Sequence, residues 1–116
     1  MKTVIGPNTF ITKFAYKTVD SVLPSSGKKI TQRESICYIK HATSKDASTV
    51  LVDVSVRTDS RDNFERAVGR SLAFKKALTT LFADKTVRER FGLGNVEFNQ
   101  FVRDFYEQCP NSVALM

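Results

Sequence analysis

Three stretches in the first half of the chain alternate apolar and polar residues with the period of two that is typical of β-strands. Residues 9–19 place aromatic side chains on one side and Lys13 and Lys17 on the other. Residues 30–41 alternate less cleanly, which indicates either cover on both faces or a β-bulge. Residues 50–57 place four valines on one side. Short polar connections join the three stretches and predict an antiparallel meander.

In the second half of the chain the apolar residues change to helical spacing. Residues 62–82 form the longest predicted helix, with a capping box from Asp62 to Glu65 and Ser60 as a competing cap. The positions expected to face the core are Phe64, Ala67, Val68, Ser71, Phe74, Leu78, Leu81 and Phe82.

Two shorter helices complete the predicted elements. Asp84 is expected to cap a helix over residues 85–91, and Asn95 to cap a helix over residues 96–108. Glycines follow the first of these helices, and Pro110 ends the second. The glycine turn between them predicts a helical hairpin.

These elements predict one α+β domain over residues 1–116. A three-stranded antiparallel β-meander (about residues 9–57) precedes a long helix and a C-terminal helical hairpin (about residues 62–109), in the order β-β-β-α-α-α. Residues 1–5 add either a short strand or a frayed end, and residues 110–116 form a loose tail. A chain of this length can build one hydrophobic core without disulfides or metal.

The formal net charge of +6 is concentrated in the strand half of the chain. Residues 1–58 carry nine Lys and Arg against four Asp and Glu, a net of +5, whereas residues 59–116 carry nine against eight, a net of +1. A basic surface attracts phosphate backbones, anionic membranes or acidic proteins. No apolar run approaches the roughly 18 residues of a membrane span, so a membrane partner is not expected. The start of the chain also lacks the apolar segment of a secretory signal.

Few residues resemble a catalytic constellation. The sequence has no phosphate-binding loop, dinucleotide-binding glycine motif, zinc-protease motif or hydrolase elbow. His41 is the only histidine and is expected to be structural, and Cys37 and Cys109 are expected to be free thiols in a reducing, cytoplasmic compartment. Asp53 is expected to pair with a cation on a neighbouring strand rather than to bind a metal. The sequence therefore predicts a non-enzymatic protein without a cofactor.

The first candidate binding surface is the outer side of the predicted sheet. Its cations come from the strands and from the loop between the first two of them: Lys13, Lys17, Lys28, Lys29, Arg33, Lys40 and Arg57. Such a platform can hold phosphates, and an exposed aromatic residue such as Tyr38 can stack on bases. The alternative is a solvated face whose lysines discourage pairing of edge strands.

The second candidate surface is the side of the long helix opposite its apolar face. Gly69 and Ala73 lie there between three cations, Arg66, Arg70 and Lys76. The small residues admit either an anion or the last helix at short distance. Close helix packing is favoured, because a glycine in a helix interior costs about 1 kcal/mol relative to alanine.

Residues 86–104 also have the outline of a helix-turn-helix. Its second helix would present Glu97, Asn99, Gln100 and Arg103 to bases. Residues 95–109, however, carry one cation and three anions, and an acidic helix is a poor fit beside phosphates. An ordinary helical hairpin is therefore the favoured interpretation.

The segment from Asp62 to Leu78, DNFERAVGRSLAFKKAL, follows a valine-rich strand. It resembles segments of small uncharacterised proteins encoded by bacteriophages, in which an Asp-x-Phe-x-Arg-x-x-Gly-Arg-x-x-Ala run follows a strand. The resemblance covers roughly 20 residues and implies an early or accessory phage protein that acts in a host cytoplasm. It implies no activity and no site residues.

Two functions follow from these surfaces. The favoured one is a small module that binds DNA or RNA through a basic sheet face, and the alternative is a phage-type accessory protein that binds and inhibits an acidic, nucleic-acid-handling host protein. A homodimer through an open sheet edge, or through the Gly69 and Ala73 side of the long helix, is compatible with either function.

Overall fold

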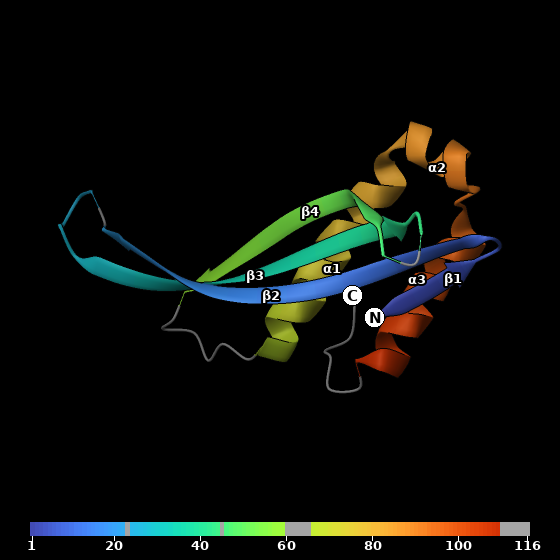
Figure 1. Cartoon of the computed structure of the whole chain (residues 1–116). Coiled ribbons are helices and arrows are strands. Elements are labelled where there is room, and N and C mark those ends of the chain that lie inside the picture. Colours follow the sequence, from blue (N-terminus) through green and yellow to red (C-terminus); the bar gives the residue numbers. More distant parts are fainter. Residues whose placement is uncertain (23, 45, 60–65, 110–116) are drawn as a thin grey trace.

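The computed structural model describes residues 1–22, 24–44, 46–59 and 66–109. Four strands precede three helices (Figure 1): β1 (Lys2–Ile5), β2 (Asn8–Val22), β3 (Lys29–Ala42), β4 (Ser48–Asp59), α1 (Arg66–Ala83), α2 (Lys85–Phe91) and α3 (Asn95–Gln108). The α+β class and the order of sheet before helices are confirmed. The three-strand prediction is one strand short, because residues 2–5 form an edge strand rather than a frayed end. Ser60, Asp62, Phe64, Glu65 and the predicted tail lie outside the described residues.

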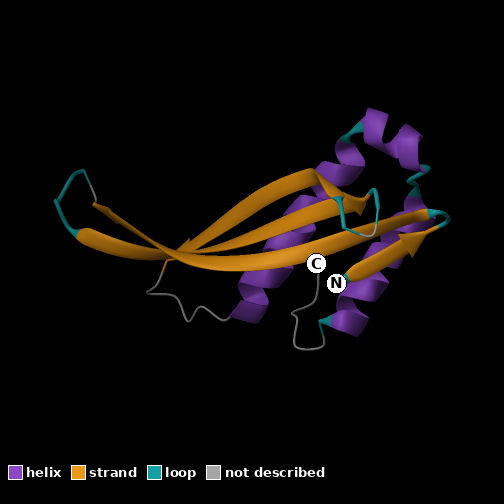
Figure 2. Ribbon diagram, viewed as in Figure 1, coloured by secondary structure: helices purple, strands orange, loops and turns teal. Residues whose placement is uncertain are grey.

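The four strands form one antiparallel sheet in the order β1-β2-β3-β4, and the helices lie together on one of its faces (Figures 1 and 2). Helix α1 packs against β3 and β4, and α3 packs against β1. Residues that lie opposite each other on neighbouring antiparallel strands project to the same face. The register therefore defines a core face, which the helices cover, and an outer face, which no described element covers.

A β-bulge between β3 and β4 changes which valines are buried. Ile39 lies opposite Val52, but Lys40 lies opposite Val50, so Leu51 is an extra residue in β4. Val52 is buried, whereas Val50 turns to the outer face and keeps half of its surface exposed. The prediction that four valines share one face is therefore wrong for Val50, because the bulge reverses the side-chain alternation at that point.

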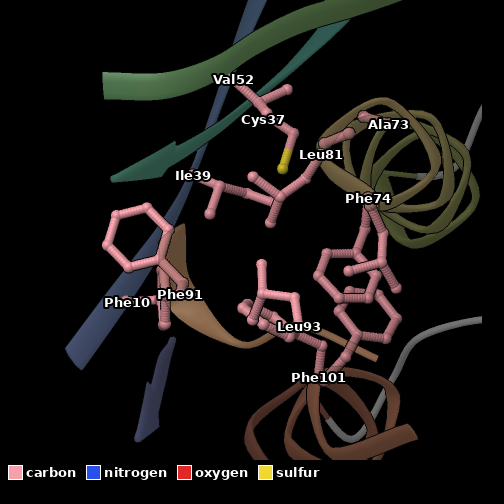
Figure 3. Packing of buried hydrophobic residues seen from close by; sticks show 13 residues of the cluster. Phe10, Cys37, Ile39, Val52, Ala73, Phe74, Leu81, Phe91, Leu93 and Phe101 are labelled. Carbon is pink, nitrogen blue, oxygen red and sulfur yellow. The ribbon is translucent and has the colours of Figure 1, made fainter. Parts of the chain in front are cut away.

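Helix α1 uses its small residues to approach the sheet. Ala73 and Ala77 are fully buried, and Gly69 is buried as well. In Figure 3, Cys37 and Val52 extend from the sheet toward Ala73 of α1. The prediction that Gly69 and Ala73 lie on the outer side of the helix is therefore wrong. Small residues on this side of α1 permit close packing, as expected, but α1 packs mainly against β3 and β4 rather than against the last helix.

Aromatic side chains fill the space between the sheet and the helices (Figure 3). Phe10 of β2 contacts Phe91 of α2 and Phe101 of α3, with ring centroids 5.3 and 5.5 Å away. Phe74 of α1 stacks on Phe105 of α3. Because all five rings are buried, burial of their apolar surface links every helix to the sheet in one core.

The short helices begin and end as capping chemistry dictates. The Asp84 carboxylate accepts a hydrogen bond from the Val87 N–H at 3.2 Å, which confirms Asp84 as the cap of α2. Gly92 ends α2 with φ of 65°, a left-handed conformation that suits glycine. The prediction that Asn95 caps α3 is wrong by one residue. Gly94 occupies that position, and its N–H donates to the Glu97 carboxylate at 3.0 Å.

The two edges of the sheet differ. On β1, the Gln108 side-chain amide makes two bonds of 2.8 Å, accepting from the Lys2 N–H and donating to the Lys2 carbonyl. Gln100 donates to the Val4 carbonyl at 2.7 Å. Two glutamines of α3 therefore occupy main-chain groups that another strand would otherwise bind. On the β4 edge, the Lys76 ammonium donates to the Ser55 carbonyl at 3.0 Å.

At the far end of the sheet, β2 and β3 continue past the end of β4 as a two-stranded arm. Their last pairs, from Asp20 opposite Thr31 to Val22 opposite Lys29, have no β4 partner. The Thr31 hydroxyl donates to the Asp20 carboxylate at 3.0 Å and holds the two strands together. The arm and its turn project away from the helices (Figure 1).

Candidate functional site

Four rows of side chains cross the strands in the central part of the outer face of the sheet. Successive rows lie about two residues, or roughly 7 Å, apart along each strand. In order along the sheet, the rows are Lys2–Ile11–Lys40–Val50, then Lys13–Tyr38–Asp53, then Ala15–Ile36–Ser55, then Lys17–Glu34–Arg57. Cations thus lie at both ends of this set of rows, with aliphatic and aromatic groups between them.

In the fourth row an acid neutralises part of the charge. The Glu34 carboxylate lies 3.0 Å from Arg57 Nε and 3.5 Å from Lys17 Nζ, and only 7% of its side chain is exposed. The hydrogen bond from Arg57, together with the charges of Lys17 and Arg57, holds the pKa of Glu34 below its ordinary value. Lys17 and Arg57 are therefore on the predicted face, but their charges are shared with Glu34.

Unlike Lys17 and Arg57, the cations of the first two rows have no acidic partner among the described residues. Within the described part of the chain, Lys2, Lys13 and Lys40 form no salt bridge, so their charges face solvent or a ligand. Lys13 lies directly opposite Tyr38, whose side chain is half-buried at the centre of this face. These groups form the part of the surface that combines unpaired positive charge with an aromatic ring.

Among the described residues, Asp53 does not form the predicted ion pair with a cation on a neighbouring strand. It lies at the end of the second row, opposite Tyr38, and is exposed. It makes no salt bridge with any residue that the structure describes. The reason is its position on an edge strand, where its one cross-strand neighbour is a tyrosine rather than a cation.

Three of the predicted strand and loop cations lie elsewhere. Arg33 is opposite Thr18, in line with Phe14 and Cys37, so it projects to the core face. Lys28 and Lys29 are exposed at the tip of the arm. The prediction of one continuous platform is therefore wrong for Arg33, because its position has the opposite side-chain parity from Lys40.

The predicted helix surface is not an open groove. Gly69 and Ala73, which would form its floor, are buried. Lys76 is exposed and reaches the β4 edge, whereas Arg70 is half-buried. The side chain of Arg66 lies outside the described residues. The structure therefore places Lys13, Lys17, Lys40 and Arg57 on one face of the sheet, while helix α1 lies on the other face and reaches the β4 edge through Lys76.

The α2–α3 hairpin is a support for the sheet. Gln100, which a helix-turn-helix would direct toward bases, donates to the Val4 carbonyl, and Glu97 bonds the N–H of Gly94. The His41 Nε2 lies 3.1 Å from the Asn8 side-chain oxygen, and the ring centroids of His41 and Phe91 are 4.6 Å apart, so His41 packs between β2 and α2. No three metal-ligating side chains converge among the residues that the structure describes.

Sequence reasoning missed Lys2, Glu34, Gln100 and Gln108 as contributors to this architecture. Lys2 and Glu34 join the outer face only through the register of the strands, and the glutamines act on residues about one hundred positions away. A net charge of +6 and a period-two pattern signal a basic sheet face, but neither pairs one particular residue with another.

Comparison of the chain with protein-family models, curated protein sequences and solved structures finds no match. Among the described residues, no helix has the length and apolar character needed to cross a membrane.

Proposed function

We propose that the protein is a small non-enzymatic module that binds nucleic acid on the outer face of its sheet. The observation that carries the proposal is the grouping of Lys2, Lys13 and Lys40 around the half-buried Tyr38, on a face that no described element covers. Ammonium groups bind phosphates without regard to sequence, and an aromatic ring on an open sheet can stack on an unpaired base. Single-stranded DNA or RNA therefore fits this face better than a duplex.

The chemistry of the two halves of the face gives the ligand a preferred position. Near β1, the lysines of the first two rows have no acidic partner among the described residues. In the fourth row, Glu34 opposes an approaching phosphate and neutralises part of the charge of Lys17 and Arg57. We therefore place the main phosphate contacts at Lys13 and Lys40, with Lys28 and Lys29 at the arm tip as a separate, outlying contact.

Fluorescence anisotropy with labelled single- and double-stranded oligonucleotides, measured over a series of salt concentrations, tests the proposal. Log affinity falls as log salt rises, and each lost phosphate contact reduces the steepness of this fall by about one, so K13E/K40E should reduce it by about two. Tyr38→Ala should weaken single-strand binding by roughly 1–3 kcal/mol, whereas Tyr38→Phe should retain most of the affinity.

The matched control is K85E/R88E, which makes the same charge change on α2, where both side chains are exposed on the helical side of the sheet. It should weaken binding only through the change in net charge. Binding on the outer face would be contradicted if K13E/K40E and K85E/R88E lost the same amount of oligonucleotide affinity, or if no complex formed at low salt.

A second candidate function, binding to an acidic host protein, is favoured by the aliphatic groups on the same face. Val4 and Val50 each keep about half of their surface exposed there, at 48% and 50%. Such groups contribute to a protein interface but not to phosphate binding. A pull-down from nuclease-treated lysate separates the two functions. Retention of a defined partner by the wild type, and its loss in Val50→Asp, would favour the protein partner.

A further inference from the structure

The edge of the sheet formed by β4 differs from the edge formed by β1 in what covers it. Side-chain amides of α3 bind the outward main-chain groups of β1. On β4, the Ser55 carbonyl points away from β3, since Lys76 reaches it. In an antiparallel ladder alternate residues direct their main-chain groups to the same side, so those of Asp53 and Arg57 point outward too. No described strand pairs with this side of β4.

We propose that this edge of β4 pairs antiparallel with β4 of a second copy of the chain, about a twofold axis at Ser55. Ser55 then lies opposite Ser55 of the partner copy, and the two strands exchange main-chain hydrogen bonds. The two sheets join into one, and both outer faces lie on the same side of it. The inference is independent of the proposed nucleic-acid binding, because the edge lies beside the outer face and needs no ligand.

Charge selects this register among those available to the outward-facing residues. Centring the pair on Ser55 places Asp53 opposite Arg57 of the partner copy, and Arg57 opposite Asp53 of the partner copy. Centring it on Asp53 or on Arg57 places two like charges opposite each other. Opposite charges at directly facing positions stabilise a strand pair, and like charges destabilise it. Asp53 has no ion-pair partner among the described residues of its own chain, so it is available for this contact.

The side chains beside the axis suit the same register. Arg57 binds Glu34 through Nε, which leaves its two terminal amino groups to meet a second carboxylate. On the core face, Val54 and Val56 are only partly buried, and each lies opposite the other across the axis. Pairing therefore adds two salt bridges on one face and continues the apolar core on the other.

Lys76 competes with this pairing. Its ammonium occupies the Ser55 carbonyl, which is the acceptor that the Ser55 N–H of the partner copy needs. Lysine side chains on edge strands are a common way to discourage such contacts. Because Lys76 is exposed, its ammonium can return to water when the second strand arrives. Removing it should therefore strengthen the dimer.

The test is the mass of the full chain in the absence of nucleic acid, measured by sedimentation equilibrium over a range of concentrations. The wild type should approach twice 13.1 kDa as the concentration rises. Asp53→Arg places two arginines opposite each other at both ends of the contact, and should raise the dissociation constant roughly tenfold or more. Asp46→Arg, in the exposed β3–β4 turn, is the control for the charge change.

Two further variants distinguish this edge from other surfaces. Ser55→Pro removes an outward N–H that pairs with no strand among the described residues, and an edge strand tolerates proline there, so circular dichroism should remain native while the dimer is lost. Lys76→Ala should lower the dissociation constant. A monomer at every concentration, or an Asp53→Arg dimer as tight as that of Asp46→Arg, would overturn the proposal.

Discussion

Phe74 of α1 and Phe105 of α3 lie face to face, with their ring centroids 4.3 Å apart and their planes only 4° from parallel. Phe14 of β2 contacts both rings from the sheet, at 6.5 and 6.1 Å. This trio joins the long helix, the last helix and the sheet at one point. Its geometry makes Phe105 a sensitive probe of the contact between α3 and the rest of the core.

Phe105→Ala should destabilise the protein by about 3–5 kcal/mol, because it removes a fully buried ring and leaves a cavity. Phe105→Leu fills more of the space and should cost less. Urea unfolding followed by circular dichroism measures both. Val96→Ala is the control on the same helix, since Val96 is 75% exposed, and it should change the stability by no more than about 0.5 kcal/mol.

Glu34 should make stability depend on pH. Arg57 and Lys17 lower its pKa in the folded state, so the ionised carboxylate stabilises the fold above the ordinary pKa of about 4.5. That contribution is lost as the pH falls through the lowered folded-state pKa. Glu34→Gln removes the titrating group, so its stability should fall less steeply below about pH 4.5 than that of the wild type. If the melting temperatures of the wild type and of Glu34→Gln change with pH in parallel, the ion pairs of Glu34 contribute nothing to stability.

Glu34→Gln also links stability to ligand binding. The substitution frees Lys17 and Arg57 from their shared acid and raises the positive charge of the outer face. Under the proposed function, oligonucleotide affinity should therefore rise at low salt, and the rise should shrink as salt screens the charges. An affinity unchanged from the wild type would place the bound strand away from the fourth row.

Gln108 should hold β1 in the sheet. Gln108→Ala removes both side-chain bonds to Lys2 and should cost about 0.5–1.5 kcal/mol, because these bonds lie at an exposed edge. Hydrogen exchange should accelerate at the amides of β1 while those of β3 stay protected. Gln32→Ala, in a half-buried position on β3, is a suitable comparison. Uniform acceleration throughout the sheet would indicate global destabilisation instead.

The two cysteines should differ in reactivity. Burial, and to a smaller extent the Cys109 thiol, raises the pKa of Cys37 to about 12, so at pH 8 only about one molecule in ten thousand carries the thiolate. A thiol-specific reagent at pH 8 should therefore modify Cys109 of the folded chain and spare Cys37 until the protein unfolds. Cys109→Ser should abolish the rapid reaction. Rapid labelling of this variant would contradict the burial of Cys37.

The elements of this fold could be predicted from the chain because their signals are local. Aromatic and β-branched residues alternate along β2, and α2 has a cap, a helical spacing and a terminal glycine within a few residues. The errors arose where one residue changes the geometry of its neighbours. The extra Leu51 turns Val50 outward, and the buried small residues of α1 resemble a polar side on a helical wheel.

The candidate surface could be predicted only in part, because it depends on contacts across the chain. Lys13, Lys17, Lys40 and Arg57 share a face as expected. Whether each is paired depends on Glu34, which lies between Lys17 and Arg57 only in the folded register. The hydrogen bonds of Gln100 and Gln108 to β1 leave no periodic trace, since glutamine on a helix surface is ordinary.

The projecting arm gives the molecule a hydrodynamic signature. The principal extents of the whole chain are 53, 27 and 25 Å, and its radius of gyration is 16.1 Å, against about 13 Å for a compact domain of this length. Such an elongated particle experiences more friction than a sphere of equal mass and elutes early from a sizing column. Elution volume alone would thus make a single chain resemble an assembly. Shortening the arm at its tip should move the peak later by more than the lost mass explains.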